Sequence, residues 1–270
     1  MKSSNVISLG EALIDRLYPL EGEDELENTF VDCFGGAPAN VACALSRLGA
    51  SVSFLGSVGN DEFGQKFKNL MISRGINISG LQQDDFRPTR VVLVRRDANG
   101  ERSFGGFDGD KGGGFADQAI SLEKISRDWP LIAQRAQWLI VGTIPLASRT
   151  SSEALLWCIK KSIDSGIKIA IDVNWRPTFW RKKVSKLLAP SIDEQIKVNS
   201  LLKNASLIKL AKEEANWFFN SNNPNEISSM LPQRPSVIIT DGSNPVQWLL
   251  NKNIGETISL KPSEVIDTTG

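Results

Sequence analysis

The composition of this 270-residue chain is that of an ordinary globular protein, with 41% hydrophobic and 23% charged residues. Lys plus Arg equals Asp plus Glu, at 31 each, so no overall field favours nucleic acid or an acidic membrane surface. The absence of histidine excludes Ser-His and Cys-His catalytic groups and His-ligated metals. Acid–base chemistry is therefore left to carboxylates, lysines or the single tyrosine.

The cysteines and the N-terminal residues indicate a cytoplasmic protein. Cys33, Cys43 and Cys158 are widely spaced and odd in number, which favours reduced thiols over a disulfide framework. Residues Met1–Ser4 lead directly into a short apolar stretch, so we expect no secretory signal peptide. No apolar run approaches the roughly 20 residues of a membrane helix. The cytoplasm is the expected compartment, or the plastid stroma if the source is a plant.

Short apolar runs alternate with amphipathic stretches along the chain. The predicted strands are Val6–Leu9, Ser51–Leu55, Trp138–Val141, Lys168–Val173, Leu207–Leu210 and Val237–Thr240. The predicted helices are Ala39–Leu48, a helix capped by Asp61, a helix capped by Ser151 or Ser152 with Leu155, Ile159 and Ile163 on one face, and Lys212–Phe219. This βαβ rhythm predicts a doubly wound, mostly parallel sheet.

Two extended segments interrupt this rhythm. Leu13–Phe34 is acidic and lacks a helical face, and Arg90–Phe107 has the pattern of a hairpin with its turn at residues 97–100. We interpret residues 13–34 and 88–110 as a small β-lid inserted in the core. No repeat or linker divides the chain, so residues 1–270 are expected to form a single domain.

Glycines and polar residues near the first strand indicate a ligand site. Gly35 and Gly36 permit unusual backbone angles and close approach of a ligand, and Asn40 follows in the first turn of a helix. Asp15 comes shortly after the first strand, at the sheet edge where α/β proteins bind ligands. The structural alternatives are a loop-to-helix hinge for Gly35–Asn40 and a solvated turn carboxylate for Asp15.

Further polar residues follow later strands. Asp172, Asn174 and Arg176 lie just past a buried strand, where a ligand site and a structural ion pair are about equally plausible. Glu214 lies near a helix N-terminus, which favours acids through the helix dipole alone. The glycines of Gly56–Gly64 have the wrong spacing for a dinucleotide fingerprint, and the sequence contains no Gly-Lys-Ser/Thr phosphate loop.

Taken in order, these motifs resemble the ribokinase-like (PfkB) family of carbohydrate kinases, and most closely its cyanobacterial and plastid fructokinase-type members. The Gly-Gly-x-x-x-Asn spacing of Gly35–Asn40 is one of the family's two signatures. Asp172–Arg176 matches an Asp-x-Asn-x-Arg element, and Thr240–Ser243 matches a Thr-x-Gly-Ser turn. The resemblance implies a three-layer α/β/α core with a mostly parallel sheet and a small β-lid.

The resemblance also implies roles for individual residues. The sugar would be held by Asp15, Gly35, Gly36, Asn40, Asn174 and Arg176. Arg176 would also brace the phosphoryl oxygens, and the nucleotide would contact Lys209, Thr240, Gly242 and Ser243. Glu214 would organise Mg²⁺ through water, and Asp267 would help to hold a monovalent cation such as K⁺. Two departures concern Ala211, where many relatives have Asn, and Asn244-Pro245, which replaces the usual Lys/Asn-Gly.

The implied reaction is phosphoryl transfer from MgATP to a sugar hydroxyl, with fructose as the first candidate. The alternatives are a kinase of another sugar or a nucleoside, and a non-catalytic family member that acts as a binding protein. A nicotinamide dehydrogenase is the weakest alternative. The expected partner is a small sugar, and neither nucleic acid nor a membrane is expected as a partner. Lids of this kind often pair in homodimers, so a homodimer through the lid is a further expectation.

The last residues resemble the start of the family's phosphate-binding turn. Val265–Gly270 would continue as Ala-Gly-Asp, in which Gly270 begins the anion hole and the Asp, three positions on, is the general base. We therefore expect this sequence to be a fragment or a partial gene product.

Residues 1–270 alone are predicted to aggregate and to show no ATP-dependent sugar phosphorylation. A general base contributes on the order of 10²–10⁴-fold to the rate, and the implied sheet would lack covering helices. A coupled kinase assay and light scattering on the purified chain test this expectation, and substantial turnover would contradict it.

Overall fold

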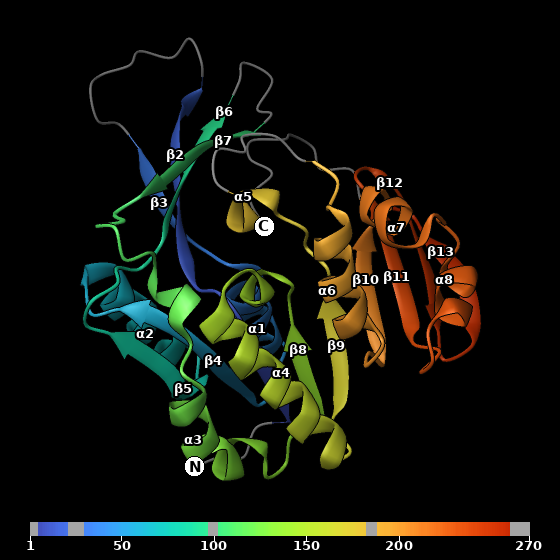
Figure 1. Ribbon diagram of the computed structural model, residues 1–270, viewed down its shortest axis with the longest axis horizontal. Coiled ribbons are helices and arrows are strands. Elements are labelled where there is room, and N and C mark those ends of the chain that lie inside the picture. The colour runs from blue at the N-terminus through green and yellow to red at the C-terminus, as the bar shows by residue number, and fades with distance from the viewer. Residues whose placement is uncertain (1–4, 21–29, 97–101, 182–187, 260–270) are drawn as a thin grey trace.

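The computed structural model describes residues 5–20, 30–96, 102–181 and 188–259 (Figure 1). A nine-stranded sheet with the order β13-β12-β11-β10-β9-β8-β1-β4-β5 forms the core. Its strands are β1 Val6–Leu9, β4 Val52–Gly59, β5 Asn77–Asp84, β8 Trp138–Val141, β9 Lys168–Asp172, β10 Leu207–Ala211, β11 Ser236–Asp241, β12 Asn244–Leu250 and β13 Asn253–Thr257. The pairings from β5 to β11 are all parallel, and the two antiparallel pairings are those of β12 with β11 and with β13. The predicted mostly parallel sheet is confirmed.

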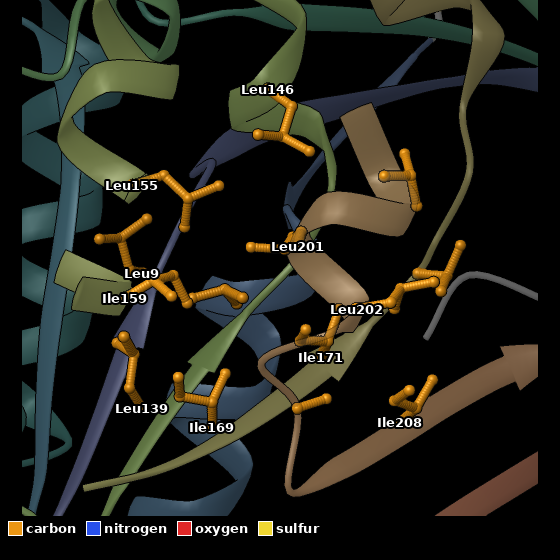
Figure 2. Packing of buried hydrophobic residues seen from close by; sticks show 14 of the residues in the cluster. Leu9, Leu139, Leu146, Leu155, Ile159, Ile169, Ile171, Leu201, Leu202 and Ile208 are labelled. Atoms are coloured by element: carbon orange, nitrogen blue, oxygen red, sulfur yellow. The ribbon is translucent and has the colours of Figure 1, made fainter. Parts of the chain in front are cut away.

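Helices cover both faces of this sheet because its strands are apolar on both faces. The helices of the described segments are α1 Ala37–Arg47, α2 Glu62–Ser73, α3 Leu122–Ala133, α4 Arg149–Asp164, α5 Pro177–Trp180, α6 Ile192–Leu202, α7 Lys212–Phe219 and α8 Pro224–Met230, with 3₁₀ turns η1 Ala116–Ala119 and η2 Ile144–Ala147. Every residue of β4 is buried. Phe54 packs in one cluster with Phe67 of α2, whereas its neighbour Leu55 packs in another with Leu155 of α4. The core therefore has three layers, and Figure 2 shows the packing in the larger cluster, including Leu9, Leu139 and Leu155.

A second, four-stranded sheet forms the lid, with the order β3-β2-β6-β7 (Figure 1). Its strands are β2 Leu13–Leu20, β3 Val31–Gly35, β6 Val91–Arg96 and β7 Arg102–Asp108. Alternating residues Leu13, Leu17, Val92 and Val94 form a small apolar cluster of their own. The expected small β-lid and the β6–β7 hairpin are confirmed, while the expected turn at residues 97–100 lies outside the described residues.

The predicted start of α4 is wrong. The helix begins at Arg149, and neither Ser151 nor Ser152 caps it. Ser151 lies inside the helix and is fully buried, where its hydroxyl donates to Asp117 O at 2.8 Å and accepts from Ile120 N at 3.1 Å. A serine near a helix start looks like a cap in sequence, but here its hydroxyl has partners from another segment.

The predicted apolar face of α4 is also partly wrong. Leu155 and Ile159 are buried, but Ile163 is 50% exposed. A residue eight positions further along a helix has turned by about 80° relative to the first, so Ile163 has left the buried face that Leu155 occupies.

Other local predictions agree with the structure. Asp61 caps α2 by accepting from Gly64 N at 2.8 Å. The predicted strand Ser51–Leu55 is longer than expected, because β4 continues through Gly59. Cys33, Cys43 and Cys158 all lie in described segments and form no disulfide. None of the helices in these segments is long and apolar enough to cross a bilayer.

Replacement of Ser151 by alanine is predicted to destabilise the protein by about 1–3 kcal/mol, because the buried Ile120 N–H would lose its acceptor. The matched control is Ser152→Ala, which removes the neighbouring half-buried hydroxyl and should change stability by about 0.5 kcal/mol or less. Urea unfolding of the two variants measures the difference, and equal losses would contradict the assigned role of Ser151.

Candidate active site at the carboxyl edge and lid junction

The lid joins the core at the carboxyl edge of the parallel strands. Residues 10–12 connect β1 of the core to β2 of the lid, and the backbone passes from β3 of the lid directly into α1 of the core through Gly35 and Gly36. Because the core strands from β5 to β11 are parallel, the segments that follow β1, β9, β10 and β11 all lie along this edge. The predicted sugar-side and nucleotide-side residues therefore share one edge of the sheet.

Two glycines allow the close approach of backbones at this junction. A Cβ on Gly35 would lie 2.3 Å from Asp15 Oδ2, and a Cβ on Gly36, whose φ is +97°, would lie 2.4 Å from Glu11 O. Neither position could carry a side chain without displacing its neighbour. Asn40 N donates to Gly36 O at 2.9 Å in the first turn of α1. The structure thus places Asp15 against Gly35, and Asn40 one helical turn after Gly36, while their role in holding a sugar stays a prediction.

Glu11 is a buried carboxyl group at this junction that the sequence analysis did not identify. Its side chain is only 2% exposed, and its Oε1 accepts a hydrogen bond from Ala37 N at 3.1 Å. Burial raises the pKa of Glu11 to about 8, with smaller contributions from the negative charges of Asp117 and Asp172 and opposition from backbone hydrogen bonds. The sequence feature that could have identified Glu11 is its position between Gly10 and two apolar residues, directly after a buried strand.

A buried ion pair between Arg90 and Asp117 ties the lid to the core beside this group. The Nε and Nη2 atoms of Arg90 lie 3.0–3.2 Å from the Asp117 carboxylate, and each side chain is 3% exposed. Phe107, Phe115 and Phe179 surround the guanidinium, with ring centroids 4.3–4.7 Å away. The pair was also missed, because nothing in the local sequence distinguishes these two charges from exposed ones.

The loop after β9 carries the predicted Asp172–Arg176 element. Lys209 Nζ of β10 lies 3.2 Å from Asp172 Oδ1, an ion pair that lacks hydrogen-bond geometry. Asn174 has φ +40°, a left-handed backbone conformation that marks a tight turn at this point. Arg176 is exposed at the start of α5, where its Nη1 donates to Trp175 O at 3.2 Å. The structure brings Asp172 and Lys209 together, whereas Arg176 faces solvent.

Glu214 braces this loop against α7. Its two carboxylate oxygens accept hydrogen bonds from Trp175 N at 2.6 Å and Ala211 N at 2.7 Å, and the side chain is buried. Burial is also the main reason that the pKa of Glu214 is raised. Within the described segments no three Asp, Glu or Cys side chains gather in a way that could hold a metal ion. A magnesium role for Glu214 stays a prediction.

The predicted nucleotide side is the turn between β11 and β12. Gly242 has φ +53°, and both Gly242 and Ser243 are exposed, while Thr240 lies half-buried at the end of β11. An ion pair of 2.7 Å joins Lys212 to Asp241 and holds the pKa of Asp241 below its usual range. A hollow of about 350 Å³ next to this turn is lined by Lys212, Asn222, Ile239, Asp241, Asn244, Pro245, Gln247 and Glu256. Lys212 is a cation that the sequence analysis did not assign to this side.

A larger hollow of about 760 Å³ opens between the α7–α8 connection and β13. Asparagines at positions 216, 220, 222, 223 and 225 contribute to its lining, and it contains none of the predicted site residues. Asp267 and Gly270, the predicted cation and anion-hole residues, lie outside the described residues.

Comparison with known proteins identifies the family. The profile of the pfkB family carbohydrate kinases matches residues 3–270. The chain belongs to this family. Among curated relatives, a probable fructokinase-5 of Arabidopsis thaliana is 28% identical over 270 residues, covering 98% of this chain and 78% of the relative. A fructokinase of Vibrio alginolyticus is 30% identical over 265 residues, covering 97% and 78%.

Solved structures of PfkB kinases share the fold. A fructokinase of Xylella fastidiosa with bound ATP superimposes with a TM-score of 0.78 at 25% identity, covering 94% of this chain and 77% of that one. A sugar kinase of Pyrococcus horikoshii in complex with ATP gives a TM-score of 0.77 at 27% identity, covering 96% and 78%. The ribokinase-like fold expected from the sequence is confirmed.

Glu11 is predicted to make the stability of this PfkB kinase fall as the pH rises. Its ordinary pKa of 4.5 is raised to about 8 in the folded state, so the folded protein holds an extra proton between these values. The contribution of this extra proton to the free energy of unfolding is complete below about pH 4.5. It declines above that pH and is lost as the pH rises through 8. A shift of this size corresponds to about 3–5 kcal/mol.

Glu11→Gln should remove this dependence, and its advantage over the unaltered protein should be largest above pH 8. Urea unfolding at pH 5, 7 and 9 measures the change, with Glu123→Gln as the control because Glu123 is exposed. A parallel pH dependence in both variants would mean that Glu11 is not the titrating group.

Proposed function

We propose that this PfkB kinase transfers the γ-phosphoryl group of MgATP to a hydroxyl group of fructose. The observation that carries this function is the position of Asp15 against Gly35 at the lid junction, with Asn40 in the first turn of the helix that follows Gly36. Relatives that are themselves described as fructokinases, from plants and bacteria, support the choice of sugar.

The residues at the junction suit a polyhydroxylated substrate. A carboxylate such as Asp15 accepts hydrogen bonds from two hydroxyl groups, and the Asn40 amide can both donate and accept. Gly35 and Gly36 leave the backbone open to the ligand. In phosphoryl transfer the protein mainly positions the reactants and stabilises charge, so a rigidly held hydroxyl group is the central requirement.

Lysine and arginine side chains at the same edge suit the phosphates. In our proposal Lys209 and Arg176 face the phosphoryl groups, and the turn of Thr240, Gly242 and Ser243 contacts the nucleotide. Arg176 is exposed in the structure and must turn towards the substrates when they bind.

Magnesium enters this reaction as part of MgATP. Glu214 has about four lone-pair positions and uses two of them for backbone N–H groups, which leaves acceptors for water molecules bound to the ion. Its chemistry therefore fits the indirect role implied by the resemblance. The monovalent cation at Asp267 is retained as a prediction.

A homodimer through the lid is also part of this proposal. Strand β3 is an edge strand of the lid sheet, and its Val31 and Phe34 are 63% and 37% exposed. An exposed apolar edge strand is a surface on which a second copy can pair.

The proposed sugar is tested by calorimetric titration of the folded protein with fructose, ribose, 2-keto-3-deoxygluconate and adenosine, which measures binding without turnover. Fructose should bind most tightly, and Asp15→Asn should weaken its binding by about 10–100-fold, because a hydrogen bond to a charged group contributes about 1.5–3 kcal/mol. ATP binding should be unchanged. Asp193→Asn, at an exposed carboxylate on α6, is the matched control.

Two outcomes would contradict the proposal. If the folded protein binds none of the sugars, the family's substrate site is not functional in this chain. If adenosine binds and fructose does not, the chain is a nucleoside kinase of the same family.

A further inference from the structure

Glu11 contacts both segments through which β2 and β3 of the lid leave the core. The residue itself belongs to the connection from β1 to β2. Its Oε1 accepts from Ala37 N in the connection from β3 to α1, and its carbonyl oxygen occupies the space that a Cβ of Gly36 would need. One residue therefore ties together two chain segments that are 26 positions apart.

We propose that Glu11 is a positioning residue for the sugar, because by tying these segments together it holds Asp15 of the lid in place relative to Asn40 of the core. This inference rests on the proposed function, in which Asp15 and Asn40 hold the sugar. Asp15 lies four residues after Glu11 on β2, and Asn40 lies three residues after Ala37 on α1. A shift of either segment would move Asp15 away from Asn40, and the two side chains could no longer hold one sugar.

Burial, and to a smaller extent the surrounding charges, favour the neutral form of the Glu11 carboxyl group. Asp117 of η1 and Asp172 of β9 are its acidic neighbours, and each already has a cation, Arg90 and Lys209 respectively. Glu214 of α7, the next acidic group beyond Asp172, is hydrogen-bonded to two backbone amides.

Glu11 itself has no cation, and its Oε2 is buried without a hydrogen-bond partner in the described part of the chain. Ionisation would place an unpaired negative charge between two others. The segments would then have to separate to admit water or a cation.

The test is the affinity for fructose between pH 6.5 and 9.5, measured by calorimetry for the unaltered protein, Glu11→Gln and Glu11→Ala. If only the neutral form of Glu11 holds the junction, fructose affinity should fall about tenfold between pH 7 and 9, as the pKa of about 8 requires. Glu11→Gln keeps an acceptor for Ala37 N and cannot ionise. Its affinity should stay within about threefold of the unaltered protein at pH 7 and should not fall at pH 9.

Glu11→Ala should bind fructose at least tenfold more weakly at every pH, because Ala37 N loses its acceptor. ATP affinity should be the same in all three proteins. The inference is overturned if Glu11→Gln shows the same alkaline loss, or if Glu11→Ala binds fructose as well as the unaltered protein.

Hydrogen exchange at pH 7 separates this inference from the proposed function. Peptides that cover residues 10–12 and 36–40 should exchange at least tenfold faster in Glu11→Ala than in the unaltered protein and in Glu11→Gln. This readout needs no sugar, so it decides the role of Glu11 even if fructose is not the substrate. Unchanged exchange in Glu11→Ala would overturn the positioning role.

Discussion

The close backbone contact between the end of β1 and the start of α1 is the constraint on which the site depends. Gly36 approaches the backbone oxygen of Glu11 so closely that no side chain fits, and Gly35 lies against the side-chain carboxylate of Asp15. This contact places a lid strand against the carboxyl edge of a parallel sheet. The predicted sugar-side residues can meet only because these two positions carry glycine.

Paired charges surround this contact. Arg90 neutralises Asp117, and Lys209 neutralises Asp172, so among Asp117, Asp172 and Glu11 two acidic groups have cationic partners. A buried carboxylate without a cation is costly, and the third group, Glu11, has its pKa raised accordingly. The charge balance at this edge of the sheet thus depends on the proton of Glu11 as well as on the cations Arg90 and Lys209. A kinase must bring the phosphates of ATP close to this edge, so the absence of a further negative charge there suits the family's reaction.

Membership of the PfkB family and the local geometry bear on different questions. The match over residues 3–270 establishes membership of the carbohydrate kinase family, and the proposed sugar rests on relatives described as fructokinases. The geometry of the structure adds details that similarity to known proteins does not provide. It shows that Glu214 acts first as a brace between a loop and α7, that Arg176 is exposed, and that the lid is fastened to the core by Glu11 and by Arg90 with Asp117.

The sequence alone determined the alternation of strands and helices, the lid and the motif positions. Apolar periodicity and glycine spacing are local properties that can be seen in the sequence itself. Val6–Leu9, Trp138–Val141 and Lys212–Phe219 were therefore predicted with the bounds that the structure has. Only the tertiary structure decided which polar groups are buried and with whom they pair. Ser151 resembled a helix cap, and Glu11, Arg90 and Asp117 resembled ordinary surface charges. Their partners come from segments distant in sequence, and burial depends on the whole fold.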